Sequence, residues 1–436
     1  MKVLGNFGIT AVELCSGPQL SQGSGALQSA PLACTDTRYN KGMTTAQKTT
    51  TKLNVISPVD ALLEATAKLL SVVPPKSPKP VLSNIRFSVR DGVLELSGTD
   101  YTAGIHYSVP SATVKEEGSG LLNAVKFEEL LKEFRGTEAA ILFTPRGGCK
   151  FKAKGGRYKV VGDDIRDYPK MPRFDRKPGF DILGSDVVDM IKKTSFAAAP
   201  EESRLTINGI LLELKEGRFR LAATDNKRMA ITERYVATTA EDFRVAVPQR
   251  FLKAILKVTT KDVAGKNATI GVTGTKVFYR LPGVTIYSTI MQGVFPPYQE
   301  ALGLRLKHHI DCSTKELLNT LRRAMLVNSD LTAFIFESGI MNLKVASSAI
   351  GDGTASMSVD LVLEDGARIR VGFNPGYFKD ALEVITTKRC RFLFEGPRNA
   401  GVLKELVTAI GSEGTTEDVS DEFVYAVMPA LLPAES

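Results

Sequence analysis

The feature that most constrains the fold of this chain is an internal repeat. The segment LSNIRFSVRDGVLELSGTD (82–100) returns in similar form as INGILLELKEGRFRLAATD (207–225), with Asn84 and Asn208 placed 124 positions apart. Aromatic residues in three helix-like segments keep the same spacing, since Phe127, Phe251 and Tyr377 are separated by 124 and 126 positions. Solenoid repeats are about 20 to 50 residues long. The longer period therefore predicts three repeated domains.

Each repeat shows the same order of elements. The segments 57–73, 184–196 and 313–326 carry apolar residues at helical spacing, and a second amphipathic segment follows in each repeat. The segments 85–98 and 210–223 alternate apolar and polar residues around RDG and KEG turns, which is typical of antiparallel hairpins. We therefore predict an α+β fold with domains at 52–178, 179–303 and 304–436, each with two helices and antiparallel sheets. Residues 1–51 are rich in Gly, Ser, Thr and Gln, and we expect a disordered arm or an over-extended start.

Composition excludes several classes of protein. The 436 residues contain no apolar run long enough to span a bilayer and no secretory signal, so we expect a soluble, cytoplasmic protein without membrane contact. The five cysteines lack the spacing of a disulfide framework or a zinc site. We expect no metal and no cofactor. The net charge of +8 makes a polyanion a plausible partner.

Basic residues recur on nearly every expected helix. Arg250, Lys253 and Lys257 share one helix face at spacings of three and four. Any amphipathic helix has a charged outer face, but repetition at equivalent positions favours a common basic surface. Because the chain has no Trp for base stacking, contact with the backbone of duplex DNA fits better than single-strand binding. The other helix-borne basic residues are Lys68, Lys132, Arg135, Lys192, Lys193, Arg322, Arg323 and Lys379.

No catalytic constellation stands out. The three histidines are too few and too scattered for a metal centre or a nucleophilic triad. The cluster Asp163, Asp164 and Asp167 could hold a divalent ion, which leaves a metal-dependent nucleic-acid-modifying enzyme as a rival, but such a loop is more often a solvated turn. The recurring Thr-Asp pairs at Thr99 and Thr224 predict strand-end turns in which Asp accepts backbone hydrogen bonds.

Several motifs, taken in order, resemble a known family. They are KPVLSNIRFSVRDGVLELSGTD, INGILLELKEGRFRLAATDNKRMAI, VFPPYQEAL, VGFNPGYFKDAL and VYAVMPALL, which together span roughly 52–432. The chain resembles the bacterial DNA polymerase sliding clamp, the beta subunit of DNA polymerase III. The resemblance implies three domains of the DNA clamp fold that close as a head-to-tail dimeric ring around duplex DNA. It implies a non-catalytic processivity factor that is opened by a clamp loader and that tethers the replicative polymerase and repair factors.

The resemblance also implies three sets of site residues. Short partner peptides of the Gln-Leu-x-Leu-Phe kind would dock between the second and third domains on Ile207, Thr224, Asn226, Arg228, Met229, Pro296, Asn374, Tyr377, Met428 and Pro429. DNA would contact Lys76, Lys132, Lys192, Arg250, Lys253, Lys257 and Arg322. The homodimer interface would set Leu130, Phe134, Tyr158 and Val160 against Met325 and Leu326.

The sequence departs from the usual family pattern at a few places. Asn226-Lys227-Arg228-Met229 stands where Gly-His-Arg-Leu is common, so the peptide preference is expected to differ. Leu205 and Thr206 replace tyrosines that contact DNA in some members. These departures leave open a divergent second clamp that serves repair.

Overall fold

The computed structural model describes residues 52–144, 147–174, 179–200, 209–328, 330–364, 368–411 and 414–433. These residues belong to one unit that begins at Thr49. The expected arm at 1–51 and the site residue Ile207 lie outside the described residues. Among the described residues, no helix is long and apolar enough to cross a membrane.

The first repeat contains two main helices, α1 and α2, as its apolar periodicity predicts. Asn123 caps α2 by accepting a hydrogen bond from the Lys126 N–H at 3.1 Å. The elements are β1 (Asn54–Pro58), α1 (Val59–Leu69), η1 (Pro80–Ser83), β2 (Asn84–Arg90), β3 (Val93–Thr99), β4 (Ala103–Val109), β5 (Thr113–Glu116), β6 (Ser119–Asn123), α2 (Ala124–Lys132), β7 (Glu138–Phe143), β8 (Gly148–Ala153), β9 (Gly156–Val161) and η2 (Ile165–Asp167).

The described part of the second repeat follows the same order without a counterpart of β5, and it adds a short helix, α5. Helix α3 ends one residue before the expected limit at 196, because the chain turns at Phe196. The elements are β10 (Gly179–Leu183), α3 (Gly184–Ser195), β11 (Gly209–Lys215), β12 (Arg218–Thr224), β13 (Arg228–Tyr235), β14 (Phe243–Pro248), α4 (Gln249–Val258), α5 (Lys261–Ala264), β15 (Asn267–Thr273), β16 (Lys276–Leu281) and β17 (Val284–Thr289).

The third repeat again pairs two main helices, α7 and α8, after a linker that contains α6. Ser313 caps α7 and Asn374 caps α8, each through its side-chain oxygen. The elements are α6 (Gln299–Leu302), β18 (His308–Ser313), α7 (Thr314–Met325), β19 (Thr332–Glu337), β20 (Ile340–Ser347), β21 (Gly351–Ser358), β22 (Asp360–Val362), β23 (Ile369–Phe373), α8 (Pro375–Leu382), β24 (Arg389–Phe394), β25 (Gly401–Gly411) and β26 (Gly414–Val427).

The same tight turn joins one hairpin in each repeat. Its two central residues are Asp91-Gly92, Glu216-Gly217 and Ser338-Gly339, all with positive φ between 50° and 75°. Two consecutive residues with positive φ suit the right-handed twist of a two-residue hairpin. The RDG and KEG hairpins predicted from sequence are therefore confirmed, and the third repeat has an equivalent turn.

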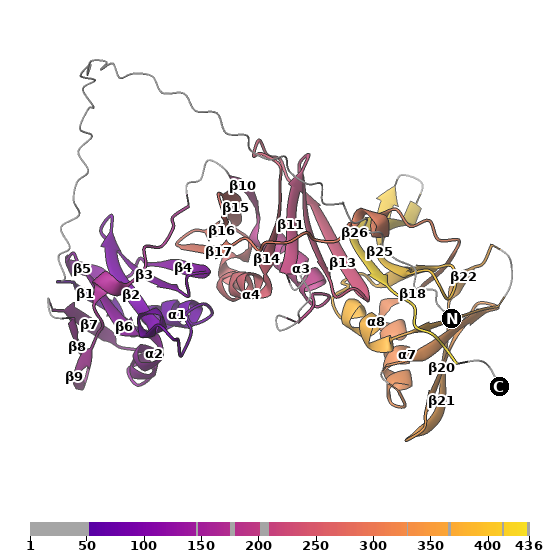
Figure 1. Cartoon of the computed structure of the whole chain (residues 1–436), viewed down its shortest axis with the longest axis horizontal. Helices are drawn as coiled ribbons and strands as arrows, with labels where there is room; N and C mark the ends of the chain where they lie inside the picture. Colours follow the sequence, from indigo (N-terminus) through magenta and orange to yellow (C-terminus); the bar gives the residue numbers. More distant parts are fainter. Residues whose placement is uncertain are drawn as a thin grey trace, which may run out of the picture. The chain divides into compact units, whose positions relative to one another are not determined.

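The sheets do not coincide with the repeats (Figure 1). The eight-stranded sheet has the order β10-β15-β16-β17-β4-β3-β2-β6, and the nine-stranded sheet has the order β14-β11-β12-β13-β26-β25-β24-β18-β22. Antiparallel pairing of β17 with β4 joins the first two repeats, and pairing of β13 with β26 joins the last two. The two remaining sheets, β5-β1-β7-β8-β9 and β21-β20-β19-β23, come from the first and third repeats alone.

The helices of each repeat pack as a pair, α1 on α2, α3 on α4 and α7 on α8. The same helices contact the strands of their own repeat, for example α1 on β3 and β4, and α3 on β12 and β13. One large core results, and its buried side chains include Leu62, Phe87, Phe251, Phe334 and Phe378. The face of each sheet that looks away from the helices therefore remains available to the linkers between repeats.

Both linkers cross that outer face and are anchored there by a buried carboxylate. In the first linker, Arg173 donates to Glu95 at 2.7 and 2.9 Å. In the second, the Tyr298 hydroxyl donates to Glu213, and its ring is fully buried. Glu95 and Glu213 are only 7% and 5% exposed, so each carboxylate has lost most of its contact with water. The hydrogen bonds donated by the linker residue replace those lost to water.

Candidate functional site

The Thr-Asp turn of the second repeat organises the junction with the third. The Thr224 hydroxyl donates to the Arg228 carbonyl at 2.7 Å and accepts from the Asn226 N–H at 3.1 Å. The Asp225 carboxylate accepts from the N–H groups of Lys227 and Arg228 at 2.9 and 3.0 Å. Asn226 has a φ of 71°, a left-handed conformation that Asn tolerates well. The turn predicted from sequence is confirmed, and it projects the Arg228 side chain toward α8.

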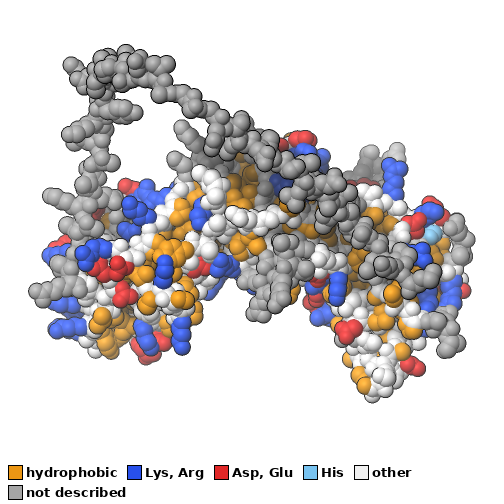
Figure 2. Space-filling view, viewed as in Figure 1, with side chains coloured by type: hydrophobic (Ala, Val, Ile, Leu, Met, Phe, Trp, Pro, Cys, Tyr) orange, Lys and Arg blue, Asp and Glu red, His pale blue; other side chains and the backbone are white. Residues whose placement is uncertain are grey.

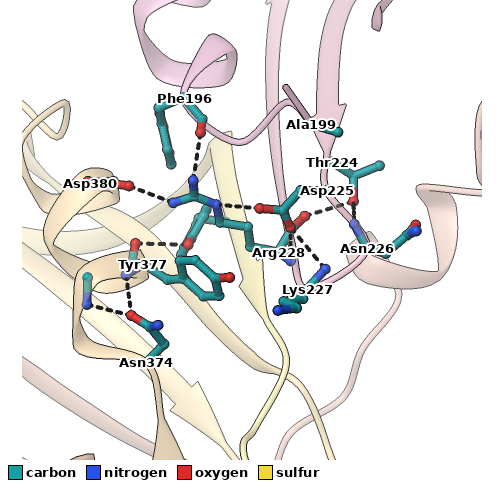
Figure 3. A network of polar contacts seen from close by, with 12 residues as sticks. Phe196, Ala199, Thr224, Asp225, Asn226, Lys227, Arg228, Asn374, Tyr377 and Asp380 are labelled. Carbon is teal, nitrogen blue, oxygen red and sulfur yellow. Dashed lines mark hydrogen bonds and ion pairs between the residues drawn. The ribbon is translucent and has the colours of Figure 1, made fainter. Parts of the chain in front are cut away.

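Arg228 connects three segments through its guanidinium group (Figure 3). It donates to Asp225 at 3.0 Å, to Asp380 on α8 at 2.7 Å and to the Phe196 carbonyl at 2.9 Å. The guanidinium also lies 4.5 Å from the centre of the Tyr377 ring. Burial opposes the charge, but the hydrogen bond to Asp380 and the nearby carboxylates raise the pKa of Arg228 above its usual value. Arg228 is thus a permanent cation at the junction.

Helix α8 contributes Asn374 and Tyr377 to the same junction. The Asn374 side chain accepts from the N–H groups of Gly376 and Tyr377 at 2.8 and 3.3 Å, so it fixes the start of the helix. The Tyr377 carbonyl accepts from the Tyr425 hydroxyl at 2.8 Å, which ties α8 to β26. Tyr377 therefore stands beside Arg228 on a fixed helix end.

The other expected peptide-site residues lie around the end of β26. Met428 donates its N–H to the Lys227 carbonyl at 2.8 Å, and its side chain is 47% exposed. Met229 packs with Phe295 and Tyr298 against the outer face of the sheet, and Pro296 is partly buried beside them. Because side chains alternate along β13, Arg228 and Met229 lie on opposite faces. Polar residues thus gather on the α8 side and apolar residues on the linker side, with Met428 and Pro429 at the strand end between them.

A second ionic contact joins the first two repeats. Arg250 on α4 donates to the Asp100 carboxylate at 2.7 Å and also to the Thr102 hydroxyl. Asp100 belongs to the Thr-Asp turn of the first repeat, where it accepts from the Thr102 and Ala103 N–H groups. Next to it, the Tyr287 hydroxyl donates to Thr99 at 2.9 Å across the β4–β17 junction. The Tyr287 ring occupies the space that a side chain at Gly104 would fill.

The expected DNA-contacting residues differ in their surroundings. Lys192, Lys253 and Lys257 are exposed on α3 and α4, and Lys76 is exposed in the loop after α1. Lys132 pairs with Glu128 at 2.8 Å, and Arg322 pairs with Glu383 at 2.9 Å. Figure 2 shows Lys and Arg side chains over the coloured parts of one face, with Asp and Glu among them.

Two lysines that we expected on outward basic faces are buried instead. Lys193 is 4% exposed and donates to Glu405 of the third repeat at 3.0 Å. Lys68 is 8% exposed and pairs with Glu64 at 2.5 Å. The partner of Lys193 is itself buried, whereas the Glu64 side chain is 57% exposed. Because both lysines are buried and paired, the expectation of an outward basic side chain is wrong for both.

Comparisons with known proteins agree with this architecture. The sequence matches three family models: the DNA polymerase III beta subunit N-terminal domain over 54–172, its central domain over 182–297 and its C-terminal domain over 304–409. Together these matches cover well over half of the chain. The chain belongs to the DNA polymerase III beta subunit family.

Individual clamps of this family are related at low identity. The beta sliding clamp of Chlamydia trachomatis is 25% identical over 346 residues, which cover 78% of this chain and 80% of that protein. The beta sliding clamp of Bacillus subtilis is 23% identical over 352 residues, with 77% and 92% coverage. Among solved structures, the Bacillus subtilis clamp aligns with a TM-score of 0.79 at 20% identity, and the Pseudomonas aeruginosa subunit with 0.78 at 22%, each covering 87% of this chain and 100% of the other. The fold predicted from the repeats is confirmed.

The expected interface residues of this beta subunit lie on edge strand β9 and at the ends of helices α2 and α7. Tyr158 on edge strand β9 is 46% exposed, and its ring contacts Phe134 at 5.7 Å. Leu326, after α7, is 77% exposed, whereas Met325 is partly buried. Leu130 and Val160 pack against the core while remaining partly exposed.

The acidic cluster that motivated an enzymatic alternative is engaged in local contacts. Asp163 accepts from the Asn84 amide at 2.5 Å, and Asp164 pairs with Arg166 two residues further on. Within the part of the chain that the structure describes, no group of three or more His, Cys, Asp or Glu could hold a metal ion. Cys149, Cys312 and Cys390 are free and buried.

The acidic partners of the two arginines, Asp100 for Arg250 and Asp380 for Arg228, were not predicted from the sequence. Asp100 carried a signal, because its Thr-Asp pair repeats at Thr224-Asp225 and so marks an equivalent turn beside a junction. Asp380 lies one position beyond the basic Lys379 on a helix and carried no signal of its own.

Proposed function

We propose that this beta subunit closes with a second copy into a ring around duplex DNA and tethers the replicative polymerase to its template. The observation that carries the proposal is the distribution of paired and unpaired sheet edges. In order along the repeats, β4, β13 and β21 are equivalent edge strands of one half-sheet, and β9, β17 and β26 are equivalent edges of the other. Within the chain β4 pairs with β17 and β13 pairs with β26.

Among the described strands, one edge of each kind is left over, β21 in the third repeat and β9 in the first. Pairing β21 of one copy with β9 of another would form a junction of the same kind as the two within the chain. It would join the four-stranded sheet of one copy to the five-stranded sheet of the other. Because this contact is heterologous, two copies close a ring only if the rotation per repeat is about one sixth of a turn. Exposed Tyr158 and Leu326 lie near these edges, which supports the interface predicted from sequence.

The proposed contact with DNA is electrostatic and independent of sequence. Exposed Lys192, Lys253 and Lys257 on the helices suit phosphate contacts, and such contacts carry no base information. Arg250 and Arg322 already have acidic partners, so we assign them a smaller share of this contact. We infer a non-catalytic role that depends on a loader to open the ring. A protein that encircles the bacterial chromosome works in the cytoplasm, where the chromosome lies.

We further propose that short peptides of the Gln-Leu-x-Leu-Phe kind bind at the junction of the second and third repeats. Exposed Met428 and partly buried Met229 and Pro296 offer apolar contact for Leu and Phe side chains. Arg228 and Asn226 supply polar groups beside them. A few aromatic or aliphatic anchors of this kind carry most of the binding energy in such interfaces.

The test is fluorescence anisotropy of a labelled Gln-Leu-x-Leu-Phe peptide titrated with the intact protein, with a version that ends after Val427 and with Met428→Ala. We expect saturable binding by the intact protein, loss of binding on truncation and at least about tenfold weaker binding by Met428→Ala. Leu183→Ala, which alters an exposed apolar residue on β10 of the eight-stranded sheet, is the control and should bind normally. Absence of binding by a folded, dimeric intact protein would overturn the tethering proposal.

A further inference from the structure

A cleft of about 640 Å³ opens on the outer face of the eight-stranded sheet. Its walls come from the β2–β3 hairpin, from β4, from the β16–β17 hairpin and from the linker at Arg173 and Phe174. It therefore belongs to the first and second repeats, whereas the proposed tethering site belongs to the second and third. Pockets of about 300 to 1,000 Å³ are typical of ligand sites.

The floor of this cleft is fixed by a buried polar cluster. Glu95 accepts two hydrogen bonds from Arg173, at 2.7 and 2.9 Å, and lies 3.2 Å from His106 Nδ1. His106 Nε2 lies 3.1 Å from the Pro172 carbonyl, so the ring contacts both the sheet and the linker. Phe174 then stacks on Phe278 with ring centres 5.0 Å apart. These contacts hold the linker in place, and the cleft is formed before any ligand arrives.

The rim of the cleft carries guanidinium groups that have no close acidic partner among the described residues. Arg280 on β16 is exposed and forms no ion pair with any described residue. It lies opposite Thr285 on β17, and Thr285 lies opposite His106 on β4, so Arg280 is two strands away from the polar cluster. Arg90 has a side chain 53% exposed and only a long contact, 3.5 Å, with Asp91. Since both carboxylate oxygens of Glu95 are already engaged by Arg173 and His106, an incoming anion meets mainly guanidinium groups.

Two further features of the lining restrict the chemical class of ligand that fits the cleft. Asp91 also lines the cleft with a solvent-exposed carboxylate, so closely spaced phosphates of a nucleic acid would be repelled there. Val93, 37% exposed, and Pro282, also exposed, offer apolar contact beside Arg280. Single carboxylates alternating with apolar side chains complement this mixture, and a polyanion does not.

We propose that this cleft binds an extended acidic segment of a partner protein, in which one carboxylate pairs with Arg280 and a neighbouring apolar side chain packs on Val93 and Pro282. The site would give the protein a second docking position, separate from the tethering site. A partner with both kinds of segment would then be held at two points, with an affinity that exceeds that of either contact alone.

The experiment exploits the absence of Trp from the chain. The probe is the peptide acetyl-Trp-Asp-Leu-Asp-Leu-Asp-amide, whose Trp fluorescence anisotropy is measured without background from the protein. We expect saturable binding by the full chain that weakens with added salt, and no binding of the same peptide with Asn in place of Asp.

Arg280→Glu should weaken binding of the acidic probe at least about tenfold, because a charge-assisted hydrogen bond is replaced by repulsion. Arg398→Glu is the matched control, since it makes the same change of charge at an exposed turn of the third repeat. Arg280→Glu should leave binding of the Gln-Leu-x-Leu-Phe peptide unchanged, which separates failure of this proposal from failure of the tethering proposal. Equal binding of the acidic probe by both variants, equal binding of the Asn peptide, no binding of the acidic probe, or preference for an oligo-dT probe would each overturn the assignment.

Discussion

Arg250 on α4 donates to the carboxylate of Asp100, which lies 150 residues earlier in the chain, and this contact joins the second repeat to the first. The next junction uses the same turn with the charges exchanged. There Arg228, in the strand after the turn, donates to Asp380 on α8 of the following repeat. The two junctions thus share a geometry of strands and turns, but each has its own arrangement of charge.

The contact between Arg250 and Asp100 should contribute little to stability. The Arg250 side chain is 42% exposed, so solvent screens the ion pair. A double-mutant cycle with Arg250→Ala and Asp100→Ala, followed by urea unfolding, should give a coupling energy of about 0.5 kcal/mol. A coupling energy of several kcal/mol would show that the junction depends on this pair for its stability.

The buried pair of Lys193 and Glu405 should behave differently. Their side chains are 5% and 6% exposed, and Lys193→Met would leave the Glu405 carboxylate without its nearest cation. We expect a loss of about 3 kcal/mol or more, measured by thermal unfolding, with partial recovery when Glu405→Gln is added to Lys193→Met. Lys192→Met changes an exposed neighbour on the same helix and should be nearly neutral. Similar effects of the changes at 192 and 193 would contradict the inferred burial.

Stability should depend on pH through Glu95. Burial disfavours its charge, but hydrogen bonds from His106 and Arg173 outweigh burial and lower its pKa from 4.5 to about 2. A lowered pKa stabilises the fold above the unfolded-state value, and that stabilisation is lost as pH falls from about 4.5 toward 2. We expect Glu95→Gln to be less stable than the parent by up to about 3 kcal/mol near neutral pH.

The difference between Glu95→Gln and the parent should shrink as the pH is lowered through this window. Urea unfolding at a series of pH values measures it. The control, Glu117→Gln, replaces an exposed carboxylate and should follow the parent at every pH. A stability difference that stayed constant down to pH 2 would mean that the lowered pKa of Glu95 has no role.

The proposed dimer makes a prediction at Leu326. Leu326→Asp places a charge on a side chain that is 77% exposed in the single chain, so folding should be unaffected while the dimer interface is disrupted. Light scattering should report a monomer for this variant and a dimer for the parent. Val294→Asp, at a residue 89% exposed in the second linker, should remain dimeric. If Leu326→Asp assembled like the parent, Leu326 would lie outside the interface.

Much of the fold could be predicted from local pattern. The equal spacing of Phe127, Phe251 and Tyr377 marked equivalent helices, and the RDG and KEG turns marked hairpins, because helical period and turn chemistry are written in neighbouring residues. Helix ends differed by a few residues; α1, for example, ends at Leu69 inside the expected segment 57–73.

The arrangement at the junctions could not be predicted in this way. Nothing near Lys193 indicates burial, since its partner Glu405 lies 212 residues further along the chain. The same holds for Arg228 and Asp380, and for the opposite faces taken by Arg228 and Met229, whose separation depends on which side of β13 faces α8. Only the pairing of strands from different repeats fixes these relationships.

The linkers that cross the outer face have a mechanical consequence. At each junction within a chain, a covalent strap anchored at Glu95 or Glu213 would restrain the paired strands if they began to separate. Strands β9 and β21 of two different copies would meet without any such strap, since no peptide bond connects them. A ring of two copies has two such contacts between copies and four junctions within the chains. We therefore expect the ring to open at a contact between copies, while the junctions within the chains stay intact.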